Sequence, residues 1–136
     1  MYEIFEHTAD LGLRVKAPDL NTLLVEAARG LFSIIVENPD EVQPLQQINL
    51  HIEGRDRQYL LFDWLNEILF IFDSKHLLLS RFEVQVSETG LDGVAWGEAL
   101  DIDRHQLDHE VKAITYHELK VIEQQDGWLA EVIVDI

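Results

Sequence analysis

The chain ends in the sequence WLAEVIVDI, residues 128–136. Successive side chains of an extended segment point to opposite faces, so Val134 faces one way and Asp135 the other. The β-branched residues of this segment and its alternation predict a strand that runs to the last residue. The preceding sequence QQDG, residues 124–127, is typical of a hairpin turn.

The same alternation predicts further strands upstream, over residues 2–6, 11–17, 46–53, 82–86, 94–103 and 114–123, with a turn at residues 90–93. Apolar residues at helical spacing predict helices over residues 20–37 and 57–73. We expect the second helix to be the more buried, because its apolar residues cover most of its circumference. This element order predicts an α+β fold with two helices on a mainly antiparallel sheet, as a single domain over residues 1–136.

The composition limits the classes of partner. The chain has 136 residues, and 26 acidic side chains against 10 basic ones give it a net charge of −16. Nucleic-acid affinity comes largely from Lys and Arg that neutralise phosphates, so we expect no direct nucleic-acid binding. The acidity could attract cations or a basic protein partner, or it could serve only solubility.

Three absences bear on the cellular compartment. There are no cysteines, which excludes disulfide bonds and thiolate metal sites. The first residues lack the basic and apolar regions of a signal peptide. The longest apolar stretch, residues 60–72, is interrupted by polar residues, which argues against a membrane span. The expected location is the cytoplasm, without membrane association.

Carboxylates stand near both ends of the chain. Asp10 lies at a predicted junction of two strands, and Asp135 adjoins the α-carboxylate of Ile136. Oxygen donors of this kind suit hard cations such as Ca²⁺ or Mg²⁺, and the alternative is a solvated chain end without a bound ion. Lys112 stands just ahead of a predicted strand, where it could pair with Asp10 or Asp135, contact a phosphate, or lie in solvent.

The six histidines do not show the spacing of a zinc site, and on that basis we predict none. His105, Asp108 and His109 fall in a polar segment that could bind a metal loosely or lie in solvent. His7 and Asp10 could simply shape a loop. The sequence also lacks a phosphate-binding glycine loop and a nucleophile elbow.

Four segments together resemble the archease family, and the resemblance spans essentially the whole chain. They are HTADLG (7–12), LLFDWLNE (60–67), EVKAITY (110–116) and VDI (134–136). The order and spacing of the four are more specific than any one of them. The fold implied by the family consists of strand–helix–strand–strand units, with one unit inserted in another.

The resemblance implies a non-catalytic accessory protein of an RtcB-type RNA ligase, which acts in tRNA splicing and RNA repair. Such a protein promotes guanylylation of the ligase with GTP and so supports multiple turnover. The functional residues of the family correspond to Asp10, Lys112 and Asp135, and its metal ligands to Asp10, Asp135 and the α-carboxylate of Ile136. His7 and Asp63 are candidates for supporting groups around these ligands, although Asp63 stands at a helix position that the family's site does not include.

Two other functions remain open. One is a stand-alone metal-dependent phosphoester hydrolase. The sequence shows neither a nucleophile–base pair nor a two-metal carboxylate cluster, which argues against this function. The other is a general chaperone or acidic interaction module, in which a metal would be only structural.

Overall fold

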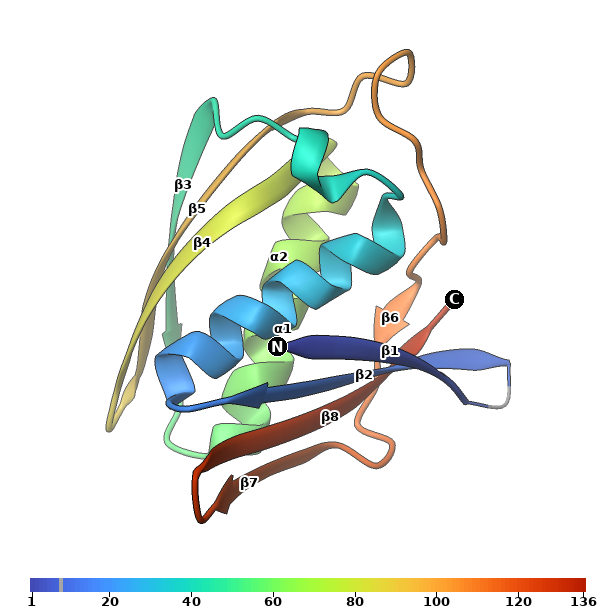
Figure 1. Ribbon diagram of the computed structural model, residues 1–136. Helices are drawn as coiled ribbons and strands as arrows, with labels where there is room; N and C mark the ends of the chain where they lie inside the picture. The colour runs from blue at the N-terminus through green and yellow to red at the C-terminus, as the bar shows by residue number, and fades with distance from the viewer. Residues whose placement is uncertain (8) are drawn as a thin grey trace.

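Two antiparallel sheets enclose two helices (Figure 1). The structure is a computed structural model that describes residues 1–7 and 9–136. Its elements are β1 (Tyr2–His7), β2 (Asp10–Ala17), α1 (Leu20–Ile35), the 3₁₀ helix η1 (Pro39–Glu41), β3 (Gln46–Glu53), α2 (Arg57–Lys75), β4 (Leu77–Ser87), β5 (Gly90–Ala99), β6 (Ala113–Ile114), β7 (Lys120–Gln124) and β8 (Gly127–Asp135). None of the helices among these described residues is long and apolar enough to cross a membrane.

The larger sheet joins strands from both ends of the chain. Its order is β1-β2-β8-β6, and β7 also pairs with β8. The smaller sheet, β3-β5-β4, comes entirely from the middle of the chain together with α2. The unit β3-α2-β4-β5 is therefore inserted between α1 and the last three strands, and every strand pair is antiparallel. The predicted α+β class with two helices and mainly antiparallel sheets is confirmed.

The first helix, not the second, is the more buried one, so that prediction was wrong. Nine of the 16 residues of α1 are buried, compared with seven of the 19 residues of α2. The buried stripe of α1 includes the small residues Ala27, Ala28 and Gly30, which let the helix approach both sheets closely. By contrast, Tyr59 and Phe70 on α2 are more than half exposed.

Trp64 joins the inserted unit to the rest of the fold. Its fully buried indole Nε1–H donates a hydrogen bond of 2.9 Å to the carbonyl oxygen of Leu24 on α1. Its ring packs over Gly93 of β5, where an added Cβ would lie 2.8 Å from the ring. Gly93 is thus an in-strand glycine that makes room for the indole. The predicted turn at residues 90–93 was wrong, because β5 begins at Gly90 and the turn lies at residues 88–89.

Two other predicted strands have different limits. The strand expected over residues 94–103 ends at Ala99. The strand expected over residues 114–123 is divided into β6 and β7, with residues 115–119 between them. Tyr116 explains this break, because its ring stacks on Phe62 of α2 with the ring centroids 3.8 Å apart. Because Tyr116 makes this contact with α2, residues 115–119 cannot continue as a straight strand paired with β8.

A network of charged side chains covers the outer face of the larger sheet, away from the helices. Arg14 on β2 donates to Glu131 on β8 at 2.6 Å and to Glu3 on β1 at 2.8 Å. Lys120 on β7 lies 3.4 Å from Glu131. The hydrogen bond from Arg14, together with the charges of Arg14 and Lys120, lowers the pKa of Glu131 although partial burial opposes this.

We expect Glu131→Gln to lower the free energy of unfolding by about 1–2 kcal/mol near pH 7, because it removes a charge-assisted acceptor shared by two cations. A lowered pKa in the folded state means that the stabilisation is complete above the ordinary carboxyl pKa of 4.5 and is lost as the pH falls through the lowered value. The difference in the free energy of unfolding between parent and variant should therefore decrease at acidic pH. Urea unfolding at a series of pH values measures it.

Glu83→Gln is the matched control, because Glu83 and its partner Arg81 are both more than half exposed. This control should change the free energy of unfolding by less than about 0.5 kcal/mol. If the difference in the free energy of unfolding between the parent and Glu131→Gln stays constant down to pH 2, the role assigned to the ionised carboxylate is wrong.

Candidate functional site

Asp10 and Asp135 come together across the pairing of β2 with β8. Leu11 pairs with Val134, and continuing this register by one residue places Asp10 opposite Asp135. Directly opposite residues have Cβ atoms roughly 4.5–5.5 Å apart and share a face of the sheet. For these two aspartates that face is the outer one, which also carries Arg14 and Glu131. Both aspartates are half-buried.

Asp10 and Asp135 are like charges on neighbouring strands. Among the residues that the structure describes, neither forms an ion pair with a lysine, arginine or histidine. Like charges directly opposite each other in a sheet are destabilising. A divalent cation with oxygen preference would remove that repulsion, so the two side chains fit such an ion.

Lys112 approaches this pair through its backbone. Its N–H donates to the carbonyl oxygen of Asp135 at 2.7 Å, and the next residue, Ala113, pairs with Asp135 in β6. The side chain of Lys112 is exposed, and its ammonium makes no ion pair within the described part of the chain. The fold therefore brings the three sequence-predicted residues to one end of three neighbouring strands.

The segment of residues 100–112, which delivers Lys112, is anchored at the end of α1. The last carbonyl groups of a helix lack partners within the helix. Here the backbone N–H of Asp108 donates to the carbonyl oxygen of Ile35 at 2.8 Å, and that of His109 donates to the carbonyl oxygen of Ile34 at 3.0 Å. These bonds complete the helix end and fix the path of the chain toward β6.

His105 anchors the same segment from inside the protein. It is 2% exposed, and its Nε2 lies 3.2 Å from a carboxylate oxygen of the buried Glu98, which also accepts from Arg104. Burial raises the pKa of Glu98, but hydrogen bonds from the backbone of Gln43, from Arg104 and from His105 outweigh it and lower the pKa overall. His105 is thus a structural residue, and the interpretation of its segment as a loose metal-binding or solvated loop was wrong at this position.

The candidate supporting groups His7 and Asp63 come from different elements, β1 and α2. His7 pairs with Asp10 in the β1–β2 register, yet its ring is directed to Glu118, with Nε2 3.2 Å from the carboxylate. Asp63 lies on α2, where its charge adds to partial burial in raising the pKa of Tyr116. The support of the metal ligands by His7 and Asp63 stays a prediction.

A second group of donors was not anticipated from the sequence. His7, His117 and Glu118 hold one ligand atom each within 4.8 Å of one another, and among the described residues this is the one such group of three. The spacing of histidines along the chain gave no sign of it, because His7 is far from the other two in sequence. This group could have been predicted only by knowing that the strand expected over residues 114–123 is interrupted, because the interruption brings His117 and Glu118 to His7.

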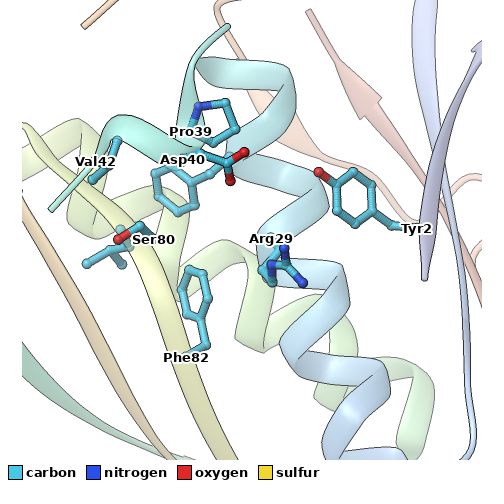
Figure 2. Close-up of a pocket in the computed structure, with 9 residues that line it drawn as sticks. Tyr2, Arg29, Pro39, Asp40, Val42, Ser80 and Phe82 are labelled. Atoms are coloured by element: carbon cyan, nitrogen blue, oxygen red, sulfur yellow. The ribbon is translucent and has the colours of Figure 1, made fainter. Parts of the chain in front are cut away.

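A cavity lies on another part of the surface. It has a volume of about 170 Å³ and is bounded by α1, β4 and η1. Figure 2 shows Tyr2, Arg29 and Asp40 among the side chains that line it. None of the sequence-predicted site residues lines it, and Arg29 is already paired with Glu26 at 3.0 Å. The candidate site is therefore the strand ends that carry Asp10, Asp135 and Lys112.

Comparison with known proteins places this arrangement in a family. The model of the archease protein family matches residues 2–136. The chain is 46% identical to the protein archease of Methanopyrus kandleri, with 99% of each chain covered, and 36% identical to that of Sulfurisphaera tokodaii, with 99% of this chain and 98% of the relative covered.

Solved structures agree with this placement. The solution structure of Methanobacterium thermoautotrophicum protein 1598 matches with a TM-score of 0.88 at 33% identity, covering 99% of this chain and 98% of that one. The crystal structure of a Thermotoga maritima archease, described as a possible chaperone, has the same fold, with a TM-score of 0.70 at 22% identity and coverage of 100% and 98%. Sequence and fold together show that the chain belongs to the archease family.

Proposed function

We propose that this protein is an accessory activator of an RtcB-type RNA ligase and acts in tRNA splicing and RNA repair. It promotes guanylylation of the ligase with GTP, which supports multiple turnover, and it catalyses no bond formation itself. Membership of the archease family supports this role. The observation that carries it is the alignment of Asp10 with Asp135 on adjacent strands, with Lys112 bonded to the backbone of Asp135.

In this proposal the aspartates hold a divalent cation, Ca²⁺ or Mg²⁺. Asp10 and Asp135 contribute side-chain oxygens, and Ile136 contributes its α-carboxylate. The donor set is entirely oxygen, which these hard cations prefer. When bound, the ion would neutralise the paired carboxylates and offer a positive centre to phosphate oxygens.

Lys112 supplies a second positive group beside that ion. Its backbone bond to Asp135 fixes where the side chain starts, and exposure leaves the ammonium accessible from solvent. We assign it to a phosphate of the GTP that the ligase uses, since an ammonium is well suited to this contact. A net charge of −16 favours docking on a basic surface of the ligase over contact with RNA.

The first test is a multiple-turnover ligation assay with the partner ligase. We expect Asp10→Ala, Lys112→Ala and Asp135→Ala each to reduce stimulation by on the order of tenfold or more, because each removes a group from the metal and phosphate site. Glu88→Ala is the control, since Glu88 is an exposed carboxylate in the β4–β5 turn, on the smaller sheet. Circular dichroism confirms that the variants are folded.

Equal stimulation by the three variants and the parent would overturn the proposal. Protection of an unrelated aggregating protein, undiminished by Asp10→Ala, would instead favour a general chaperone. Cleavage of phosphoesters in the absence of any ligase would favour a hydrolase.

The second test concerns the cation itself. Calorimetric titration with Ca²⁺ and with Mg²⁺ should show one site in the parent, and Asp10→Asn or Asp135→Asn should weaken it by about tenfold or more. Extending the chain by a glycine after Ile136 should weaken it as well, because the α-carboxylate is then displaced. Unchanged affinity in all three proteins would exclude this ligand set.

A further inference from the structure

We propose that His7, His117 and Glu118 form a second metal site, specific for a transition metal of the Zn²⁺ type. The three side chains lie on the outer face of the larger sheet, at the end where β1 turns into β2. They share no ligand with the carboxylate site of Asp10 and Asp135. The inference is independent of the proposed role in RNA ligation.

The distances between the donor atoms fit a tetrahedral ion. Zinc bonds of about 2.0–2.2 Å at tetrahedral angles place neighbouring ligand atoms roughly 3.4 Å apart. Here Nε2 of His7 lies 3.2 Å from one oxygen of Glu118, and Nε2 of His117 lies 3.8 Å from the other oxygen. All three donors fall within 4.8 Å of one another, so side-chain movements of about an ångström would complete the geometry.

The ligand types select the metal. Two imidazoles and one carboxylate, with a fourth position left to water, make up a well-known zinc ligand set. Imidazole nitrogen favours zinc and its neighbours in the first transition series, whereas Ca²⁺ and Mg²⁺ favour oxygen alone. The two proposed sites should therefore take different ions.

The turn that carries His117 and Glu118 is held firmly in place. Leu119 N–H donates to the carbonyl oxygen of Tyr116 at 3.1 Å, which closes a tight turn. Tyr116 stacks on Phe62 of α2, so the start of the turn is fixed to a helix. Glu118 adopts a φ of 55°, a left-handed conformation that residues other than glycine seldom adopt.

His7 also shows an unfilled bonding position. Its Nδ1 is buried and has no hydrogen-bond partner among the described residues, which is uncommon for a buried polar atom. A metal at Nε2 requires that Nδ1 carry the proton, and metal-bound histidines usually donate that proton to a carboxylate or carbonyl. Asp10, opposite His7 in the hairpin register, places a carboxylate on the same face.

The test is a Zn²⁺ titration of chelator-treated protein against a chromophoric competitor, with Co²⁺ absorption as a report of coordination. We expect one tightly bound Zn²⁺ in the parent and intense visible Co²⁺ bands typical of tetrahedral nitrogen and oxygen ligands. His117→Ala and Glu118→Gln should each weaken Zn²⁺ binding by about tenfold or more. At a given concentration, Zn²⁺ should also raise the thermal midpoint of the parent by more than that of these variants.

Two controls separate this site from others. His51→Ala removes an exposed histidine on the smaller sheet that is paired with Asp92, and it should bind Zn²⁺ like the parent. Asp135→Asn should also retain Zn²⁺ while losing Ca²⁺ or Mg²⁺, so that the failure of one proposed site is distinguishable from the failure of the other. Absence of Zn²⁺ binding by the parent, or parent-like binding by His117→Ala and Glu118→Gln, would overturn the inference.

Discussion

The antiparallel pairing of β2 with β8 connects the two ends of the chain, and both proposed sites depend on it. Arg14 and Glu131, which bond across this pairing, are 117 positions apart in sequence. Closing a loop of that length costs entropy that grows only slowly with length. The inner face of the pair offsets this cost by burying Leu13 against Val132, both at most 1% exposed.

The two faces of the larger sheet differ in composition and role. The inner face packs on α1 and forms part of the hydrophobic core. The outer face carries the ionic network of Arg14, the paired aspartates and the imidazole group, none of which would tolerate full burial without partners. Because side chains alternate along each strand, the residues that build the core fix the positions of the residues that carry the chemistry.

Local sequence pattern predicted the parts of the fold that local physics controls. The alternation of apolar and polar residues in β2 and β8 and the apolar stripe of α1 predicted these elements correctly, because each pattern reflects one face turned to the core. The break at Tyr116 was not readable, because it results from stacking on Phe62, a residue distant in sequence. The in-strand role of Gly93 was hidden for the same reason, since it depends on the indole of Trp64.

The amino-acid sequence was sufficient to predict the α+β class, the family resemblance, and Asp10, Lys112 and Asp135 as candidate site residues. It could do so because periodicity and motif order are properties of the chain alone. Which side chains lie next to one another depends on the three-dimensional fold. Strand register set Asp10 opposite Asp135, and a turn fixed against α2 brought His117 to His7. Register and side-chain packing join residues that are distant in sequence, so no local pattern contains them.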